Sequence, residues 1–598
     1  MTRHETPTVA ADRASLRMRR WQMPGITPEA IEALVTAGAP RPLAPILAAR
    51  GQTPETLESF LEPRLRDLVP NPSRFRDMDL LGDRVAAAIA AGEKITVWTD
   101  YDVDGATSAG LMGRFLRACG CENVAIHVPD RITDGYGPNE TGIGAIAEDG
   151  TDLLIILDSG TAAFGPLEHG RDLGLDIVVI DHHAAEDALP PALALVNPNR
   201  LDEEPGYGHL CAAGMTFLAL VAINLRLRRD GHFAARALPE PDLMGYLDLV
   251  ALGTVCDVVP LTGLNRAFVA RGLPVLSQRA TPGVAALAEA AGCGAELTAR
   301  DCGFALGPRI NAGGRIGESR SGTDLLLETD PAKAQAQAAM LDGLNRERQE
   351  MERACSADAL TQVDHFVPGQ TRQIAIAVVE AHEGIVGISA SRLKDAVDAP
   401  AFVLAPAGEG LLKGSGRSVP GFDLGAAIIK ARNAGLVEKG GGHAMAGGVT
   451  LRRDRLEDFR AFVNSEIAAS DYAATGVVSR VDAVMALRDA KVSDVAAMER
   501  LRPFGMGNPT PRILLRDVVI DDIRILKDKH IKCRLACASG SGRTVDALMW
   551  NAVGTPFAAA LEANRGVGIE VLGSLEINTW RDRESVQMKL EDARLAAP

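Results

Sequence analysis

The feature that most constrains the fold is a regular alternation, from about residue 80, of helical patterns with short apolar runs. The apolar runs lie at 95–98, 124–128, 153–157 and 176–180, and patterns such as LLGDRVAAAIAAG and SAGLMGRFLRACG lie before and between them. Continuous apolar runs flanked by helices are typical of a parallel sheet, because both sides of each strand are then covered. We therefore expect an α/β domain built on a parallel sheet.

An aspartate follows three of these predicted strands: Asp100, Asp158 and Asp181. The carboxyl ends of parallel strands lie along one edge of a sheet, and ligand sites form just beyond that edge. We therefore expect the three carboxylates to lie close together and to mark an active site.

The segment TDYDVDGATSAG resembles the first half of an EF-hand calcium loop. An EF-hand needs a glutamate at its twelfth position and a helix before the loop, but here Leu111 occupies that position and a predicted strand precedes it. The sequence therefore disfavours a calcium sensor. Asp100, Asp102 and Asp104 would still crowd like charges on one face of an extended chain, which a cation would stabilise. We expect Gly105 to let the chain turn into the next helix.

Acidic residues and two histidines from four segments form one candidate metal site. They are Asp100, Asp102, Asp104, Asp158, Asp181, His182, His183 and Asp257. This set is mostly carboxylate, with one or two imidazoles and no thiolate, which favours Mn²⁺ or Mg²⁺ over structural zinc. Two such cations suit phosphoryl chemistry, and Asp158, from the middle element, is the natural residue to bridge them. Singly, each segment has a simpler explanation, such as a turn or a polar loop.

Beyond residue 330 the sequence pattern changes twice. A long, mostly polar helical pattern leads to a smaller α/β pattern, and then to alternating runs such as ILLRDVVIDDIRIL that are typical of a small antiparallel β-barrel or sandwich. We expect five parts: an N-terminal extension or helical cap at 1–79, the parallel-sheet domain at 80–330, a connecting helix at 331–365, the smaller α/β domain at 366–470 and the barrel at 471–598.

Composition and charge narrow the class of protein. The 598 residues carry 63 basic and 78 acidic side chains, a net charge of −15, which argues against a coat of DNA-binding lysines but allows local basic patches. No apolar run is long enough to span a membrane and the start has no apolar signal core, so we expect a cytoplasmic protein without a membrane partner. Nine cysteines without a C-x-x-C pair favour neither a zinc ribbon nor a disulfide framework. We expect a monomer.

The acidic segments also resemble the motifs of a known superfamily. DYDVDG, LDSG, VIDHH and ALGTVCDVVPL are similar, in this order, to the motifs of the DHH phosphoesterases. GPRINAGGRIG, AHEGIVGISASRL, GSGRS, GGGHAMAGG and PFGMGNPTP are similar to segments of the RecJ family, which are single-strand-specific 5′→3′ exonucleases. The resemblance implies a DHH domain, a DHH-associated domain and an OB-fold in the three larger parts.

The resemblance implies a role for each residue of the candidate metal site. Asp102, Asp104, Asp158, His182 and Asp257 match metal ligands, Asp100 matches a ligand or its neighbour, and His183 matches the histidine that faces the scissile phosphate. Asp158 and His183 are therefore the expected catalytic residues. Many DHH phosphatases have a histidine ligand before the first motif, whereas this chain has Trp98 and Thr99 there, as the RecJ branch does.

The resemblance also implies how a DNA strand is held. The expected substrate-binding residues are Arg131, Arg309, Asn311, Arg315, His382, Ser415, Arg417, Gly441, Gly442 and His443. Guanidinium groups bind phosphate with two hydrogen bonds, so Arg131 and Arg417, with Ser415, would form a pocket for a terminal 5′ phosphate. The glycine run before His443 would offer a nest of N–H groups. Ordinary surface arginines and a glycine hairpin are the alternatives.

The resemblance implies a metal-dependent exonuclease that hydrolyses single-stranded DNA from the 5′ end to 5′-mononucleotides in recombination and repair, with a helicase and a single-strand-binding protein as partners. Phe504, Trp550 and Trp580 would stack bases on the OB-fold, although a core position explains each of them as well. Two alternatives stay open: a DHH phosphodiesterase of short oligonucleotides or cyclic dinucleotides, and a non-catalytic DNA-binding scaffold. The third domain disfavours the first, and the crowded carboxylates disfavour the second.

Overall fold

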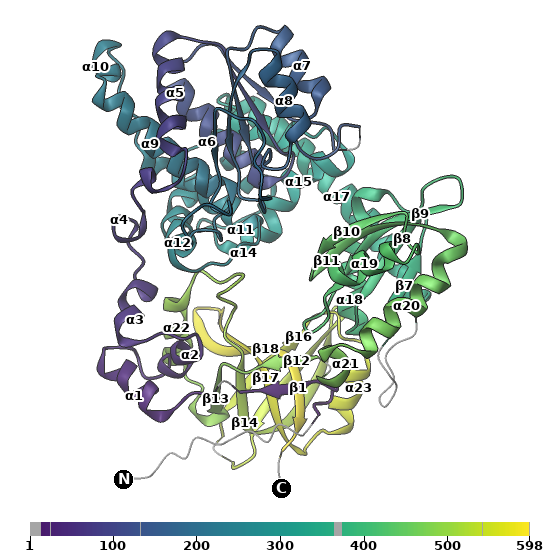
Figure 1. Ribbon diagram of the computed structural model, residues 1–598. Coiled ribbons are helices and arrows are strands. Elements are labelled where there is room, and N and C mark those ends of the chain that lie inside the picture. The colour runs from purple at the N-terminus through teal and green to yellow at the C-terminus, as the bar shows by residue number, and fades with distance from the viewer. Residues whose placement is uncertain are drawn as a thin grey trace. The chain divides into compact units, whose positions relative to one another are not determined.

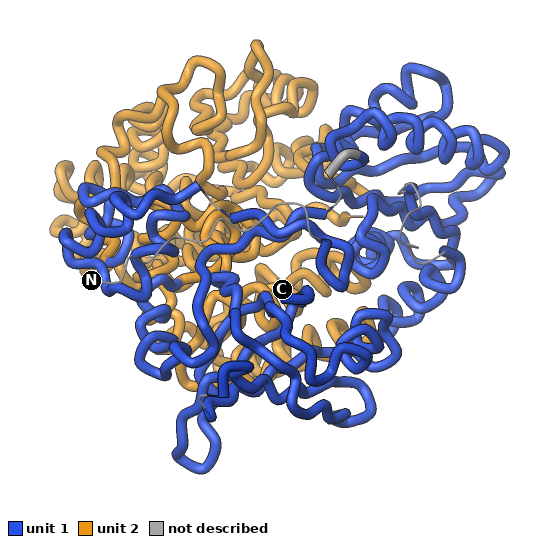
Figure 2. Tube along the Cα trace, turned by 90° about the horizontal axis from the view of Figure 1, so that it is seen from below, with its two compact units in different colours: residues 1–61, 350–502, 510–598 blue, residues 62–349, 503–509 orange. Residues whose placement is uncertain are grey.

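The computed structural model describes residues 14–596, apart from 24, 132, 364–372, 476 and 541. The start of the predicted N-terminal extension and the predicted junction at 365–366 therefore lie outside the described residues. The chain forms two compact units (Figure 2). The sheet unit is 62–349 with 503–509, and the barrel unit is 1–61 with 350–502 and 510–598.

Five parallel strands form the centre of the sheet unit (Figure 1). They are β2 (Ile95–Thr99), β3 (Val124–His127), β4 (Leu153–Leu157), β5 (Asp176–Ile180) and β6 (Ala194–Val196), in the order β3-β2-β4-β5-β6. The sequence patterns predicted the first four strands. They did not predict β6, because a strand of three residues is too short to give a recognisable run.

Alternate side chains of each strand enter two different cores. In β4, Leu153, Ile155 and Leu157 join a large core on one face of the sheet, and Leu154 and Ile156 join a smaller core on the other. The large core includes α5 (Met78–Ala91), α6 (Val103–Ala118) and α9 (Ala212–Arg229), and the smaller one α7 (Glu140–Glu148) and α8 (Phe164–Asp172). The predicted parallel sheet with both faces covered is thus confirmed.

The rest of the sheet unit is helical. Its helices are α4 (Leu65–Leu68), α10 (His232–Ala235), α11 (Leu247–Cys256), α12 (Gly263–Ser277), α13 (Pro282–Ala290), α14 (Ala299–Asp301), α15 (Gly307–Ile316) and α16 (Ser321–Leu327). α11 packs against α6, α9 and α12. The predicted long polar helix is α17 (Pro331–Thr361), and the boundary between the two units falls within it.

The barrel unit contains a second, mixed sheet. Its strands are β7 (Ala375–Val378), β8 (Ala401–Pro406), β9 (Leu411–Arg417), β10 (Lys439–His443) and β11 (Ala446–Arg452), in the order β10-β11-β9-β8-β7. The helices α18 (Glu383–Val397), α19 (Leu424–Asn433), α20 (Leu456–Ala468) and α21 (Asp471–Thr475) accompany it. This is the smaller α/β arrangement expected after the long helix.

A closed β-barrel forms the remainder of this unit. Its strands are β13 (Ala483–Ala486), β14 (Ile513–Leu526), β15 (His530–Cys537), β16 (Thr544–Met549), β17 (Gly568–Trp580) and β18 (Arg583–Leu595), with the helices α22 (Val492–Met498) and α23 (Pro556–Ala563). β14 pairs with both β15 and β17, which closes the ring. The predicted barrel is therefore confirmed, although it is not wholly antiparallel, because β16 pairs with β18 and β13 with β14 in parallel.

The N-terminal segment belongs to the barrel unit. Its strand β1 (Arg20–Gln22) pairs in parallel with β12 (Val478–Arg480), and α1 (Pro28–Thr36), α2 (Ala44–Ala49) and α3 (Pro54–Leu61) follow. The indole N–H of Trp21 donates to the buried Asp592 of β18 at 2.9 Å. In the described part of the chain, no helix combines the length and the apolar character needed to cross a membrane.

Candidate active site

The ends of three neighbouring strands bring the expected aspartates to one edge of the sheet. The last residues of β2, β4 and β5 pair with one another, so the strands end level. Asp100, Asp158 and Asp181 come directly after them, and all three are buried. The predicted position of this site, just beyond the strand ends, is where the structure places it.

Asp102 and Gly105 turn the chain from β2 into α6. Asp102 caps the helix, because its Oδ1 accepts hydrogen bonds from the N–H groups of Asp104 at 2.8 Å and Gly105 at 3.1 Å. A Cβ atom on residue 105 would lie 2.3 Å from the carbonyl oxygen of Asp100, so only glycine fits there. The alternate carboxylates thus belong to a strand end and a helix cap, and not to a calcium-binding hand.

Asp104 is held between two helices. It lies in the first turn of α6, and its side chain is 1% exposed. Its two oxygens accept hydrogen bonds from the N–H groups of Ala212 at 2.6 Å and Ala213 at 2.9 Å, at the start of α9. Burial raises the pKa of Asp104, and the nearby His182 opposes that rise. α6 therefore supplies this carboxylate and α9 orients it.

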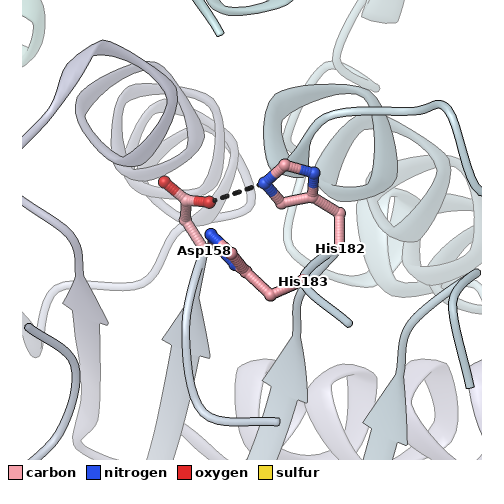
Figure 3. Close-up of side chains that lie close together, drawn as sticks. All are labelled: Asp158, His182 and His183. Carbon is pink, nitrogen blue, oxygen red and sulfur yellow. Dashed lines mark ion pairs between the residues drawn. The ribbon is translucent and has the colours of Figure 1, made fainter. Parts of the chain in front are cut away.

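Asp158 adopts a left-handed backbone conformation, with φ at 58°, which is uncommon outside glycine and costs free energy. Its N–H donates to the carbonyl of Ile180 at 3.0 Å, and its own carbonyl accepts from the Tyr136 hydroxyl at 3.1 Å. The carboxylate faces His182, with 3.2 Å between Oδ1 of Asp158 and Nε2 of His182 (Figure 3). Backbone strain is thus stored at the residue expected to bridge the cations.

His182 stands among three carboxylates. Besides its contact with Asp158, its Nε2 lies 3.8 Å from Oδ2 of Asp104, and its Nδ1 lies 3.8 Å from Oδ2 of Asp257. Asp257 directly follows α11, so a helix far along the chain completes the group that the strand ends begin.

Three groups of side chains here have donor atoms within 4.8 Å of one another. They are Asp158 with His182 and His183, Asp104 with Cys211 and Asp257, and Asp100 with Asp102 and Asp158. Asp158 belongs to two of these groups, as a residue that bridges two cations would. Asp100 shares a group with Asp102, which supports counting it among the candidate ligands.

Cys211 corrects the expectation of a site without a thiol. It directly precedes α9 and is fully buried. Burial, with the charges of Asp104 and Asp257, raises the pKa of its thiol well above the usual value. The sequence carries no signal for this placement, because Cys211 forms no spacing pattern with the other cysteines and its neighbours come from distant segments.

The carboxylates lack the partners that would stabilise them as free anions. Burial and the charge of Asp102 raise the pKa of Asp100 to about 7, and burial with the charges of Asp104 and Asp102 raises that of Asp257 to about 9. One oxygen each of Asp100, Asp158 and Asp257 is buried without a hydrogen bond. Because such atoms are costly unless an ion binds them, the residues present fit a pair of divalent cations.

His183 lies at the mouth of this group, with its side chain 46% exposed. Its Nδ1 lies 2.8 Å from Oδ1 of the buried Asp181, which also accepts from the N–H groups of His182 and His183. Burial opposes both shifts, but the pairing raises the pKa of His183 and lowers that of Asp181. His183 is therefore held by Asp181 at the solvent-exposed edge of the site.

Tyr136 is a second residue that the sequence patterns missed. Its hydroxyl lies 3.1 Å from both ring nitrogens of His183, in addition to its hydrogen bond to Asp158. The available signal was its place in PDRITDGYG, five residues after Arg131. A neutral tyrosine in such a segment does not by itself indicate a contact with a distant histidine, so this signal is too weak to predict the role.

Arg131 lies beside the acidic group within the sheet unit. Its guanidinium carbon is 5.0 Å from the ring centroid of Tyr101, and its backbone N–H donates to Ser319 at 3.1 Å. Its charge opposes the rise in the pKa of Asp100. Arg131 is thus close enough to influence the candidate ligands electrostatically.

The helix α15 carries three of the predicted DNA contacts, Arg309, Asn311 and Arg315. Arg309 donates from Nε to Asp342 at 3.0 Å and from Nη1 to the carbonyl of Ala305 at 2.7 Å. Asn311 and Arg315 are half-buried. Arg309 is therefore engaged within the protein, and contact of these three residues with DNA stays a prediction.

The predicted phosphate-binding residues Ser415 and Arg417 lie on β9 in the barrel unit. The guanidinium of Arg417 donates to the carbonyl of Gly416 at 2.9 Å and pairs with no carboxylate in the described ranges. Burial lowers its pKa, which is the expected effect on a cation that lacks a counter-ion. Such a residue favours an anionic ligand, but its joint pocket with Arg131, which belongs to the sheet unit, stays a prediction.

α18 and its N-cap carry one neighbour of Arg417, Gly387, and one further predicted substrate contact, His382. A Cβ atom at Gly387 would lie 2.9 Å from Nη2 of Arg417, so glycine leaves the space that the guanidinium uses. His382 caps this helix, because its Nδ1 accepts from the N–H of Gly384 at 3.1 Å. Its structural role is clear, and its predicted contact with substrate stays a prediction.

The glycine run before His443 forms a hairpin. It is the strand β10, paired with β11 at the edge of the mixed sheet. Successive N–H groups of a strand point in opposite directions, so the predicted nest is not formed and the simpler alternative is correct. Gly441, Gly442 and His443 remain predicted DNA contacts only as residues of an edge strand.

The three aromatic candidates have different settings. Trp550 and Trp580 are 59% and 69% exposed, and follow β16 and end β17 of the barrel. A core position therefore does not explain either of them. Phe504 lies in the segment 503–509, which belongs to the sheet unit, so it is not part of the barrel.

Three known domain families match this chain. Residues 94–254 match the DHH family, N-terminal domain, residues 371–469 match the DHHA1 domain, and residues 481–592 match the RecJ OB domain. They cover the sheet unit's strands, the mixed sheet and the barrel.

Whole-length relatives are also found. The single-stranded-DNA-specific exonuclease RecJ of Dickeya dadantii is 35% identical over 521 residues, which is 84% of this chain and 88% of the relative. The protein of that name in Escherichia coli is 34% identical over 525 residues, with 84% and 88% covered. The one in Bacillus subtilis is 33% identical over 583 residues, with 96% and 71% covered.

Solved structures agree with these matches. RecJ from Thermus thermophilus in complex with Mn²⁺ superposes with a TM-score of 0.77 at 28% identity, over 97% of this chain and 80% of the other. The same protein in complex with Mg²⁺ gives a TM-score of 0.71 at 27% identity, over 97% and 79%.

Proposed function

Because the chain belongs to the RecJ family of exonucleases, we propose that it hydrolyses single-stranded DNA from the 5′ end, with two divalent cations, Mn²⁺ or Mg²⁺. The observation that carries this proposal is the group of buried carboxylate oxygens of Asp100, Asp158 and Asp257 that have no hydrogen bond, of which those of Asp158 and Asp257 face His182. A scaffold without chemistry would have no use for such costly groups.

The residues divide into two sets of ligands that share Asp158. Asp100 and Asp102 would hold one cation with Asp158, and Asp104, His182 and Asp257 would hold the other with it. When bound, two such cations lower the pKa of a water and stabilise negative charge on a phosphodiester during its displacement. The protein would position the carboxylates. Asp102 is oriented by its hydrogen bonds at the start of α6, Asp104 by N–H groups at the start of α9, and Asp158 by its left-handed backbone conformation.

His183 would face the scissile phosphate from the solvent side of this site. Asp181 holds its Nδ1 and raises its pKa, so the imidazole is ready to donate a hydrogen bond or a proton from its other nitrogen. The Tyr136 hydroxyl, 3.1 Å from both ring nitrogens, also restrains the ring. His183 therefore binds and orients the phosphate, and its exposure gives the substrate access.

Selection of the 5′ end would come from a phosphate pocket. Arg417 lacks a carboxylate partner among the described residues and lies beside Ser415, and Arg131 lies near the acidic group. Recognition of a terminal 5′ phosphate by these groups would set the direction of digestion, and 5′-mononucleotides are the proposed products. Arg309, Asn311, Arg315, His382 and the hairpin at Gly441, Gly442 and His443 would contact the strand further along, and Trp550 and Trp580 would stack bases.

The organisation of the chain follows the same proposal. We assign catalysis to residues 80–330, substrate binding to 366–470 and strand binding to 471–598, with 331–365 as the connection and 1–79 as an extension. We also infer that the protein is a cytoplasmic monomer. It would act on DNA in recombination and repair, together with a helicase and a single-strand-binding protein.

A comparison of substrates tests this function. With Mn²⁺ the protein should digest a long single strand, leave the matching duplex largely intact, and act poorly on linear and cyclic dinucleotides; a chelator should stop digestion. Preference for dinucleotides would instead favour a phosphodiesterase of short oligonucleotides. Binding of single strands without digestion under all cation conditions would favour a scaffold.

A further inference from the structure

A thiol lies inside the candidate cation site. Cys211 is fully buried directly before α9, and its Sγ and one carboxylate oxygen each of Asp104 and Asp257 lie within 4.8 Å of one another. Tetrahedral ligands bound about 2.0–2.3 Å from one ion lie about 3.3–3.8 Å apart, so atoms within 4.8 Å of one another need only small shifts to reach that geometry. The three atoms are therefore placed to share a cation.

The structural contacts of this thiol do not require sulfur. Its Sγ lies 3.5 Å from the hydroxyl of Thr254 and also interacts with the backbone N–H of Gly214 in the first turn of α9, and a serine hydroxyl could make both contacts. The first N–H groups of that helix donate to Asp104. A serine or an alanine would fill the same position with little change in packing.

A second observation points to an ion at the same place. Oδ1 of Asp158, in a side chain that is 3% exposed, and Oδ2 of Asp257 both lack a hydrogen bond. Both face the imidazole of His182, at 3.2 Å and 3.8 Å. That imidazole also lies 3.8 Å from Asp104. The thiol therefore lies in a group of possible metal ligands that includes carboxylate oxygens without a hydrogen bond.

A sulfur donor changes which cations such a set prefers. Mg²⁺ and Mn²⁺ favour oxygen ligands, whereas Zn²⁺ and the softer Cd²⁺ also bind thiolate and imidazole strongly. Two carboxylates, one imidazole and one thiolate make four ligands, which is the number that closes a tetrahedral zinc site and leaves no position for water or substrate.

We propose that Asp104, Cys211 and Asp257, with His182, form a site that takes Zn²⁺ or Cd²⁺ in place of a hard cation, and that this thiolate-bound form is inactive. On binding, the thiol gives its proton to water and a sulfur–cation bond replaces the S–H bond, with no change of oxidation state. The binding of the soft cation does not depend on the proposed nuclease function. The proposed inactivation does, because it rests on that function.

A cadmium titration of the full, metal-stripped chain tests the binding. The probe is Cd²⁺ itself, and the readout is the ultraviolet thiolate-to-cadmium charge-transfer band. One equivalent should produce the band in the wild type and in Cys121→Ser, a half-buried cysteine of the same unit that belongs to none of the three donor groups. Cys211→Ser and Cys211→Ala should lose the band and bind Cd²⁺ about tenfold or more weakly.

The affinity for Mn²⁺ distinguishes loss of the sulfur ligand in the Cys211 variants from general disruption of the site. Both Cys211 variants should keep Mn²⁺ affinity within about threefold of the wild type, because the carboxylates that prefer Mn²⁺ remain. A first-equivalent cadmium band that persists in both variants would overturn the site. If the variants lost Mn²⁺ and Cd²⁺ binding to the same degree, Cys211 would be a packing residue, which would also overturn it.

An inhibition assay tests the consequence. Added to the Mn²⁺-loaded protein, Zn²⁺ should inhibit digestion of single strands by the wild type at a concentration about tenfold or more below that needed for Cys211→Ser. Equal sensitivity would overturn the inactivation. A protein that shows the cadmium band but never digests DNA would contradict the proposed nuclease function and leave the soft-cation site standing.

Discussion

The hydroxyl of Tyr136 donates a hydrogen bond to the backbone carbonyl of Asp158, and it also lies 3.1 Å from the ring of His183. One side chain therefore ties the strained backbone of Asp158, whose carboxylate is proposed to bridge the cations, to the histidine that would face the phosphate. Both groups depend on position for their chemistry, since small displacements weaken catalysis strongly.

Tyr136→Phe removes both contacts and keeps the ring. We expect kcat to fall about tenfold, with KM changed much less, because the hydroxyl positions catalytic groups and does not bind DNA. The alkaline limb of the pH profile should move, since His183 loses a polar neighbour. Steady-state kinetics on a labelled single strand measures both effects. Tyr207→Phe, which alters a tyrosine stacked on Arg74, is the control and should resemble the wild type.

Asp158→Asn tests the shared ligand. Asparagine tolerates the left-handed backbone at this position, so the change removes the charge with little added strain. We expect activity to fall at least about a thousandfold and calorimetry to find fewer Mn²⁺ ions bound per chain than in the wild type. The exposed Asp187→Asn should change neither quantity, and undiminished Mn²⁺ binding by Asp158→Asn would refute the bridging role.

Gly105→Ala tests the turn between β2 and α6. The added Cβ would lie 2.3 Å from the carbonyl of Asp100, so we expect a loss of stability of about 1–3 kcal/mol and weaker Mn²⁺ binding. The control is Gly343→Ala within α17, where nothing lies within 4 Å of the new atom; that change should stabilise the helix by about 0.5–1 kcal/mol. Denaturant unfolding measures both, and equal effects would contradict the account of Gly105.

The carboxylates make stability depend on pH and on cations together. Asp100 and Asp257 have pKa values raised to about 7 and about 9, above the value near 4 in an unfolded chain. The folded state therefore keeps protons that the unfolded state has lost, and this contribution to stability falls as pH rises from about 4 to about 9.

Cations should reverse that loss, because they bind the ionised carboxylates. We expect the melting temperature in chelator to fall between about pH 6 and about pH 9, and the increase caused by Mn²⁺ to grow over the same range. Thermal melts with Asp257→Asn should show a smaller pH dependence. An increase caused by Mn²⁺ that is the same at every pH would contradict the assignment of these carboxylates as ligands.

Substitutions at Arg417 and Gly387 test whether Arg417 recognises the 5′ phosphate of the strand. Arg417→Lys keeps the charge but loses bidentate recognition, and Gly387→Ala places an atom 2.9 Å from the guanidinium. Both should reduce the preference for a 5′-phosphorylated over a 5′-hydroxyl strand by about tenfold. Arg455→Lys, which alters an exposed arginine of the same unit that pairs with Asp458, is the control. Competition between the two strands gives the ratio, and an unchanged preference would place the pocket elsewhere.

Much of the fold follows from patterns that are local in the sequence. The apolar runs before Asp100, Asp158 and Asp181 predicted the sheet, and the alternating runs from residue 513 predicted the barrel, because burial imposes these periodicities. β6 was missed because three residues carry no period. The segment 503–509 lies next to the barrel in sequence but belongs to the sheet unit. No local sequence pattern predicts which unit a segment joins.

The site shows the same division. Carboxylates at strand ends could be predicted, since topology alone brings them together. Cys211 and Tyr136 could not, because their roles depend on tertiary contacts with Asp104 and His183 that leave no spacing rule. The prediction of an N–H nest at Gly441 was wrong because a glycine run can form either a nest or a hairpin. Pairing with β11, a tertiary contact, selects the hairpin.

The most direct test of the central claim follows the two ends of one strand. A single-stranded oligonucleotide labelled at either the 5′ or the 3′ end is digested with Mn²⁺, with and without chelator, by the wild type and by Asp158→Asn. The account predicts that the 5′ label appears at once as a mononucleotide, that the 3′ label stays on progressively shorter strands, and that chelator or the variant stops both. Immediate release of the 3′ label, or digestion that persists in chelator, would contradict it.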